Sequence, residues 1–227
     1  MTTTTHTWAT SAAECLILAT ANGFAQKADH PDSKDWKPLF SKALDNAVFE
    51  KGIWYYDDDG NLTATEDKII WTADDYENFT VDLEYRCGPK ANSGVFIYCS
   101  DIKNSTPNSI EIQIQQDNAN ANPTWRNGGL FGHLAPKVDN VKPAGEWNRM
   151  TITAKGQHIV VIVNGETTVD TDVSKWTSAK TNPDGTEIPP WLSRPMAELP
   201  TKGRIGFQGK HGGAPIFFRN MRIKPNN

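Results

Sequence analysis

Hydrophobic and polar residues alternate along most of the chain from Trp36 onward, and this alternation is typical of β-strands. The clearest example is SIEIQIQQD at residues 109–117, where isoleucine fills every second position of the predicted strand. Residues 78–87 and 95–99 alternate in the same way. We expect each of these strands to turn one face to a hydrophobic core and the other face outward.

The hydrophobic runs are short and end at turn-forming residues. GPKANSG at residues 88–94 has the composition of a turn, and Asn164-Gly165 is a strong hairpin signal. Residues 203–208 and 215–223 supply two further strands near the end of the chain. Many short strands separated by Gly, Pro, Asn and Asp predict an all-β sandwich of two antiparallel sheets.

Two segments lack the strand pattern. We assign residues 1–30 to a leader and residues 31–227 to one domain. Residues 174–202 contain several prolines and two tryptophans without regular alternation. Because a loop of this length inside a compact domain is usually functional, we expect it to form one wall of a binding groove.

The leader is mildly apolar but differs from an ordinary secretory signal. It has no Lys or Arg before Lys27, and Glu14 interrupts its apolar stretch. A degenerate signal, a misplaced start and a disordered leader are the three alternatives. Of these we favour the degenerate signal, which would mean export and hence a periplasmic or secreted protein.

The overall composition excludes several classes of protein. The net charge of −4 gives no basic face for nucleic acid, and no apolar run is long enough to span a membrane. The three cysteines argue against a disulfide framework. Cys87 and Cys99 lie on two arms of one predicted hairpin, too far apart to bridge, and we interpret both as small core residues. Most of the eight tryptophans are expected in the core, with the remainder exposed as platforms for sugar rings.

An acid and two amides occupy the outward positions of the clearest strand. These residues are Glu111, Gln113 and Gln115, and the neighbouring strand is expected to turn Phe96 and Tyr98 to the same side. Amides offer both a donor and an acceptor, which suits a sugar hydroxyl. We interpret this face as a groove for carbohydrate, with an ordinary solvated sheet face as the alternative.

His211 stands in a glycine-rich turn, QGKHGGAP, near the end of the chain. An imidazole in such a position can transfer a proton near neutral pH, although a loop histidine without a role is the alternative. His133, in LFGHLAP, is a weaker candidate of the same kind. His30 and His158 are interpreted as incidental.

Metal and nucleotide motifs are absent from the sequence: there is no HExxH, no paired CxxC, no EF-hand loop and no phosphate loop. The run Asp57–Gly60 is interpreted as an acidic turn because it lacks the later ligands of a calcium loop. No cofactor is indicated with certainty. A divalent ion held by His211 and a carboxylate such as Asp117 stays open.

Several stretches, in this order, resemble the 3-keto-disaccharide hydrolase family. They are WKPLF (36–40), YENFTVDLEYR (76–86), KANSGVFI (90–97), IEIQIQQD (110–117), KPAGEWNRMTI (142–152), IVVIVNGE (159–166), KWTSAKTNPDGT (175–186) and GRIGFQGKHGGAPIFFRNMRI (203–223). The resemblance implies a concanavalin A-like jelly roll. It also implies cleavage of glycosides whose sugar is oxidised to a ketone at C3, by acid and base chemistry of the elimination type.

The resemblance gives the candidate residues chemical roles. Glu111 and His211 are the candidates for base and acid, in an order that the sequence leaves open. Gln113, Asn92 and Lys210 are candidates for holding hydroxyls or the ketone oxygen. The remaining substrate-binding candidates are Phe96, Tyr98, Gln115, His133 and Gln208.

The chain departs from its relatives at one point. Many members read QDHG where this chain reads QGKHGG, so an Asp that would orient the histidine or hold a metal is missing, or its role passes to Asp117. Arg219 is interpreted as part of a structural ion pair.

A non-catalytic carbohydrate-binding module with the same groove is the alternative function. A module docking onto a partner oxidoreductase, which would supply the 3-keto sugar, is a third hypothesis.

Overall fold

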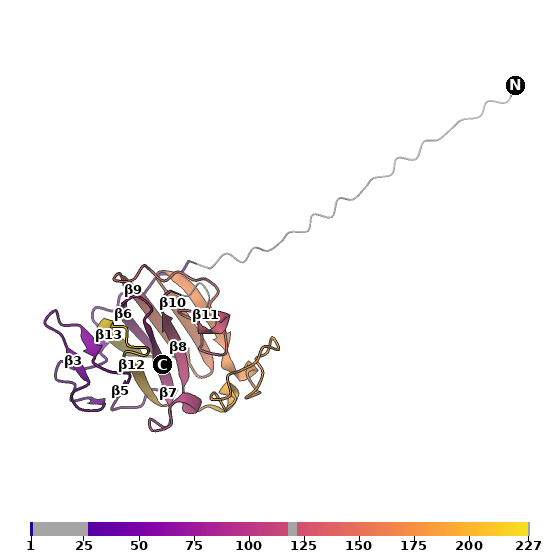
Figure 1. Cartoon of the computed structure of the whole chain (residues 1–227). Coiled ribbons are helices and arrows are strands. Elements are labelled where there is room, and N and C mark those ends of the chain that lie inside the picture. Colours follow the sequence, from indigo (N-terminus) through magenta and orange to yellow (C-terminus); the bar gives the residue numbers. More distant parts are fainter. Residues whose placement is uncertain (2–26, 118–121, 227) are drawn as a thin grey trace.

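The protein is a sandwich of two antiparallel β-sheets, seen in a computed structural model that describes residue 1 and residues 27–117 and 122–226 (Figure 1). The larger sheet has the strand order β11-β10-β9-β6-β13-β4-β3, with β1 also paired to β13. Its strands are β1 (Lys37–Pro38), β3 (Trp54–Tyr56), β4 (Leu62–Ala64), β6 (Phe79–Cys87), β9 (Trp147–Lys155), β10 (His158–Val163), β11 (Glu166–Asp172) and β13 (Ile216–Pro225). The expected all-β sandwich is confirmed.

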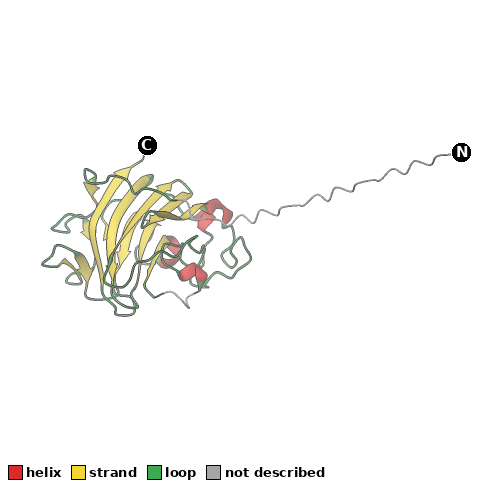
Figure 2. Ribbon diagram, turned by 90° about the horizontal axis from the view of Figure 1, so that it is seen from above, coloured by secondary structure: helices red, strands yellow, loops and turns green. Residues whose placement is uncertain are grey.

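The smaller sheet has the strand order β2-β5-β12-β7-β8. Its strands are β2 (Ala47–Val48), β5 (Ile69–Thr72), β7 (Asn92–Cys99), β8 (Ile110–Gln115) and β12 (Arg204–Gln208). Helical structure in the described residues is limited to short 3-10 turns (Figure 2), which are η1 (Thr106–Asn108), η2 (Pro123–Trp125), η3 (Val173–Lys175) and η4 (Met196–Glu198). None of these turns is long and apolar enough to cross a membrane.

The core lies between the two sheets and follows the alternation of the sequence. Every second residue of β6 and of β8 is buried there, and these are Phe79, Val81, Leu83, Tyr85, Cys87, Ile110, Ile112 and Ile114. Burying one such aliphatic or aromatic side chain contributes about 1.5–3 kcal/mol. The residues between them therefore face outward, and the outer face of β8 becomes available for polar chemistry.

The alternation is interrupted near the end of β7. Tyr98 has a positive φ of 57°, and the pairing of β12 with β7 shifts its register nearby. The Tyr98 ring consequently lies in the core against Phe79, and its hydroxyl donates to the Gly156 carbonyl at 3.1 Å. Cys99 lies instead with Phe96 in a small cluster outside the main core. The expectation that Tyr98 lines the groove is therefore wrong, whereas both cysteines are buried and free, as expected of small apolar residues.

The free edge of β8 is covered by a loop segment, residues 128–131. The Gln113 N–H donates to the Gly129 carbonyl at 3.0 Å, and the Phe131 N–H donates to the Glu111 carbonyl at 2.9 Å. This segment thus extends the smaller sheet beyond its last strand and raises a wall beside the outward residues of β8.

Residues 27–30, which we assigned to the leader, are bound to the larger sheet. The Ala28 N–H donates to the Gly165 carbonyl at 3.0 Å. His30 Nε2 accepts from the Gly165 N–H at 3.0 Å, and His30 Nδ1 lies 2.8 Å from the Thr151 hydroxyl. His30 is therefore a structural residue, and the interpretation of it as incidental is wrong.

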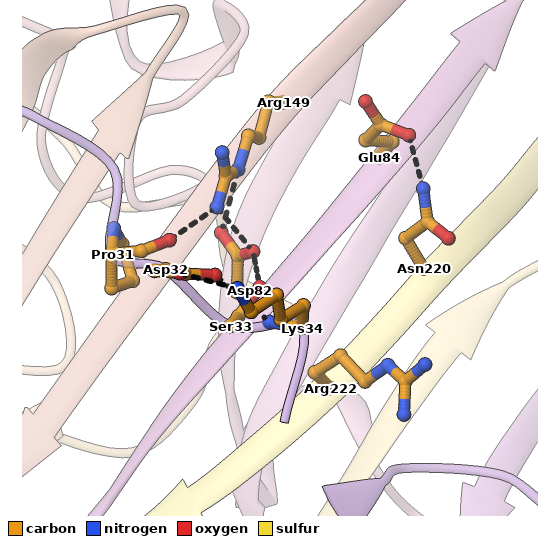
Figure 3. A pocket seen from close by; sticks show the side chains of 9 residues that line it. All are labelled: Pro31, Asp32, Ser33, Lys34, Asp82, Glu84, Arg149, Asn220 and Arg222. Atoms are coloured by element: carbon orange, nitrogen blue, oxygen red, sulfur yellow. Dashed lines mark hydrogen bonds and ion pairs between the residues drawn. The ribbon is translucent and has the colours of Figure 1, made fainter. Parts of the chain in front are cut away.

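The next residues of the same segment close over a buried carboxylate on the outer face of the larger sheet (Figure 3). Asp82 accepts from Arg149 Nη2 at 2.8 Å, from the Thr151 hydroxyl at 2.6 Å and from the Ser33 hydroxyl at 2.5 Å. Arg149 also donates to the Pro31 carbonyl. Because the buried Asp82 carboxylate is paired with Arg149 and bound by residues of the segment, we interpret this hollow as a structural anchor for the segment.

Candidate functional site

A cavity of about 430 Å³ opens on the outer face of the smaller sheet. Six residues that the sequence singled out line it together, namely Glu111, His211, Gln113, Asn92, Phe96 and Gln208. The sequence analysis missed the five other lining residues, which are Ile69, Thr106, Trp125, Phe131 and Trp191. Residues from six separate parts of the chain thus meet over one sheet.

The pairing of β7 with β8 explains why the predicted residues share this cavity. Glu111 lies opposite Phe96, and Gln113 lies opposite Gly94, so all four face the same side of the sheet. The Glu111 carboxyl group lies across Gly94, where a Cβ atom would stand 2.2 Å from Glu111 Oε1. The glycine therefore provides the space in which the carboxyl group rests.

Glu111 is the acid whose protonation the fold changes most. Burial, and then the nearby carboxylate of Asp67, raise the pKa of Glu111 to about 8. A carboxylic acid with this pKa still carries its proton at neutral pH, so it can donate a proton during a reaction.

His211 is held by a carboxylate that the sequence analysis did not identify. Its Nδ1 atom lies 2.6 Å from Asp67 Oδ2, although the two residues are 144 positions apart. Backbone hydrogen bonds fix the two loops together, from the Gly209 N–H to the Lys68 carbonyl and from the Lys210 N–H to the Glu66 carbonyl. Because the carboxylate holds Nδ1–H, Nε2 is the nitrogen able to accept a proton.

Two amide side chains on the floor of the cavity, Asn92 and Gln113, form a chain of hydrogen bonds with a third amide, Gln115. Gln113 Nε2 donates to Asn92 Oδ1 at 2.9 Å and to Gln115 Oε1 at 3.1 Å. Gln113 Oε1 has no hydrogen-bond partner among the described residues, although the side chain is only 1% exposed. Asn92 also forms an isolated β-bridge with His211, which brings the amides next to the imidazole.

Two exposed tryptophans stand at the rim of the cavity. Trp191 is 51% exposed and Trp125 is 36% exposed, and the Trp125 ring lies 5.7 Å from that of Phe131. Trp191 comes from the long segment 174–202, so this segment does reach the groove. The same segment also packs into the core, for example through Trp176.

Three other predicted residues do not line the cavity. His133 is nearly buried and its Nδ1 contacts the Phe131 carbonyl at 2.9 Å, because the ring folds back onto the preceding turn. The Lys210 backbone pairs with the neighbouring loop, while the next residue, His211, is the one that reaches the cavity. Gln115 accepts a hydrogen bond from Gln113 Nε2 and is not itself among the lining residues. None of the three is among the residues that line the cavity, so their contact with a substrate stays a prediction.

Asp117, the carboxylate proposed as a metal ligand, has another partner. Asp117 Oδ2 accepts from the Lys90 N–H at 2.9 Å and closes a turn, so Asp117 does not replace the Asp that relatives carry before their histidine. Asp67 contacts His211 instead. Over residues 27–117 and 122–226 we find no group of three or more His, Cys, Asp or Glu side chains arranged to hold a metal ion.

Arg219 and the acidic turn behave as the sequence predicted, since both are structural. Arg219 pairs with Glu84 at 2.7 Å on the outer face of the larger sheet and stacks on Trp147 at 4.0 Å from the ring centroid. Asp57 accepts from the Asn61 N–H at 2.7 Å and from the Asp59 N–H at 3.1 Å within its own turn.

Residues 21–224 match the family described as the 3-keto-alpha-glucoside-1,2-lyase-like domain. The chain belongs to this family. The resemblance to 3-keto-disaccharide hydrolases is thereby confirmed, and the family indicates a function of the glycoside hydrolase type. Among curated proteins, no sequence matches the chain.

Solved structures agree with this assignment. A candidate glycosyl hydrolase of Parabacteroides distasonis is 50% identical, with a TM-score of 0.81, over 84% of this chain and 99% of the other. A second candidate glycosyl hydrolase of that organism is 18% identical, with a TM-score of 0.65, over 81% and 90% of the two chains. The carbohydrate-binding module CBM66 of Bacillus subtilis shares the fold at 10% identity and a TM-score of 0.50, over 79% and 95%. The expected jelly-roll fold is confirmed.

Proposed function

We propose that this protein cleaves 3-keto-glycosides by β-elimination in the cavity of the smaller sheet. The observation that carries the proposal is the presence, in one cavity, of a carboxyl group that keeps its proton at neutral pH and an imidazole oriented by a carboxylate. Elimination needs one group of each kind, a donor for the leaving oxygen and an acceptor for a carbon-bound proton.

The geometry suggests the order of roles that the sequence left open. His211 Nε2 removes the proton from C2, which the ketone at C3 has made acidic, and Asp67 stabilises the imidazolium that forms. The electron pair of the C2–H bond enters an enolate. When the enolate returns to a ketone, a double bond forms between C1 and C2 and the C1–O bond breaks. Glu111 gives its proton to the departing oxygen, and water can then add to the double bond to complete a net hydrolysis.

The exposed tryptophans give the cavity its affinity for a sugar ring. The C–H face of a pyranose is apolar and packs on an aromatic ring, while its hydroxyls reach the polar groups around it. Trp125 and Trp191 at the rim can pack on the apolar face of the sugar ring, and the amides on the floor can form hydrogen bonds with its hydroxyls.

Turnover of a 3-oxidised disaccharide, compared with its unoxidised form, tests the proposed function. We expect cleavage of the 3-keto substrate alone, and the same assay with a chelator addresses metal dependence. In Glu111→Gln and His211→Ala, turnover should fall about 10²–10⁴-fold while the 3-keto disaccharide still binds. Glu66→Gln, a change at an exposed acid of a nearby loop, is the control. Wild-type turnover in both site variants would contradict the assignment.

A non-catalytic carbohydrate-binding module is the second candidate function, because CBM66 shares the fold. Such a module needs the tryptophans and amides but not the Asp67–His211 pair. Binding of sugars without turnover of any 3-keto substrate would favour it.

If the protein is an enzyme, the chemistry requires that another enzyme first oxidise the C3 hydroxyl of the sugar.

A further inference from the structure

The hydrogen bonds on the cavity floor have a fixed direction. Gln113 Nε2 has two hydrogens, and both are donated to protein oxygens, one on Asn92 and one on Gln115. Rotating the Gln113 amide by itself would set its oxygen against two other oxygens. The orientation of Gln113 is therefore maintained by its neighbours on both sides.

This direction determines what the floor presents to a ligand. Gln113 Oε1 is nearly fully buried and has no hydrogen-bond partner in the described part of the chain, so it is free to accept a hydrogen bond from a ligand. Asn92 Oδ1 is occupied by Gln113, which leaves the Asn92 Nδ2 hydrogens for the cavity. The floor thus offers one donor and one acceptor side by side.

A ketone and a hydroxyl differ in what they require from such a pair. A ketone oxygen only accepts hydrogen bonds, whereas a hydroxyl also brings a hydrogen that needs an acceptor. We propose that Asn92 Nδ2 donates to the ketone oxygen of the oxidised ring, and that Gln113 Oε1 accepts from an adjacent hydroxyl. Asn92 is thereby the residue that selects the oxidised sugar. This inference rests on the proposed function and identifies how the same site recognises its substrate.

The position of Asn92 also fits the chemistry of the reacting carbons. Its backbone forms a β-bridge with His211, and both residues line the cavity, so the donor for the C3 oxygen and the base for the C2 proton come from paired positions. Negative charge grows on the C3 oxygen as the enolate forms. A donor already directed at that oxygen stabilises the enolate without having to reorganise.

Asn92→Asp tests the selection because it replaces the donor Nδ2 with an acceptor and keeps the oxygen that Gln113 needs. Binding of a 3-keto-glucoside and of the unoxidised glucoside is measured by calorimetry in a His211→Ala background, which prevents turnover. We expect Asn92→Asp to weaken binding of the ketone at least about tenfold and binding of the unoxidised sugar about twofold, since an unpaired buried polar group carries a penalty.

Gln115→Glu is the matched control. It adds the same charge at the other end of the same amide chain and preserves the acceptor for Gln113, but Gln115 does not line the cavity. We expect the preference for the ketone to stay within about twofold of that of the His211→Ala parent, because the donor facing the ligand is unchanged. Melting temperatures of both variants show whether the fold is intact.

The results separate this inference from the proposed function. If the chain turns over 3-keto-glucosides but Asn92→Asp weakens both ligands equally, the selection by Asn92 is wrong and the function stands. If the wild type turns over no 3-keto substrate but the ketone preference disappears only in Asn92→Asp, the selection stands and the catalytic function is wrong. Equal binding of both sugars by the His211→Ala parent would also overturn the selection.

Discussion

At the scale of single residues, the site depends on one carboxylate, Asp67, which affects both the proposed base and the proposed acid. Asp67 contacts His211 directly and raises the pKa of Glu111 through space. It therefore orients the base and helps the acid keep its proton. Asp67 acts as a positioning residue, because its effect on the substrate passes through the two groups beside it.

The pH dependence of turnover tests this role. A general acid is active below its pKa, so wild-type kcat should fall above about pH 8 as Glu111 loses its proton. Asp67→Asn removes the negative charge that raises this pKa, so the alkaline limb should move to lower pH, with kcat reduced at least about tenfold and KM changed little. Asp58→Asn, at an exposed acid of a separate turn, is the control. An unchanged alkaline limb in Asp67→Asn would argue against the coupling.

Gly94 offers a second test at this scale, since Glu111 rests on it. Gly94→Ala should displace the carboxyl group and lower kcat about a hundredfold, because small misplacements of catalytic groups are costly. The melting temperature should change little, since the end of a side chain can move. Gly206→Ala is the contrast, because its Cβ would stand 2.4 Å from the buried Trp71 ring and should lower the melting temperature instead. A normal kcat in Gly94→Ala would show that this position of Glu111 is not needed.

At the scale of elements, alternation in the sequence was sufficient to predict which face of β8 carries the polar residues. The interruption in β7 was not predictable, because Tyr98 adopts a positive φ that no glycine or asparagine signals. Asp67 was missed for a different reason, since its contact with His211 joins two loops distant in the sequence. The position of Trp191 at the groove could be anticipated, because it lies in the long proline-rich segment that we expected to form a groove wall. The packing of that segment into the core could not be predicted from the sequence.

The two tryptophans of this long segment are expected to differ in role, one contributing to sugar binding and the other to the stability of the fold. Trp191→Ala should weaken sugar binding about tenfold without changing the melting temperature, because the ring is exposed at the rim. Trp176→Ala should reduce stability by about 3–5 kcal/mol, because that ring is buried and its N–H donates to Asn182. Calorimetry with the 3-keto substrate and thermal unfolding provide the two measurements. Equal loss of affinity and stability in Trp191→Ala would contradict its place at the rim.

At the scale of the whole molecule, one domain holds the site on one sheet and the N-terminal segment on the other. The expectation of export stays a prediction, because residues 2–26 lie outside the described residues. The attachment of residues 27–35 depends on neutral His30, whose Nε2 accepts from the Gly165 N–H. Burial, and then the positive charge of Arg149, lower the pKa of His30.

Acid should therefore loosen this attachment. Because the folded-state pKa is lowered, the stabilisation by His30 is complete above the ordinary histidine pKa of about 6.5 and is lost as pH falls through the folded-state value. Hydrogen exchange of residues 27–35 should accelerate between about pH 7.5 and about pH 5, after correction for intrinsic rates. In His30→Ala this change should disappear, and in His158→Ala it should persist. Equal pH dependence in wild type and His30→Ala would exclude this role.

The loop segment over β8 has a consequence for the solubility of the protein. An uncovered last strand can recruit a strand from another molecule, which begins aggregation. Residues 128–131 already occupy the backbone groups that such a neighbour would use. The wall of the cavity therefore also blocks strand pairing between copies at this edge, so loosening it to admit larger sugars would favour self-association there.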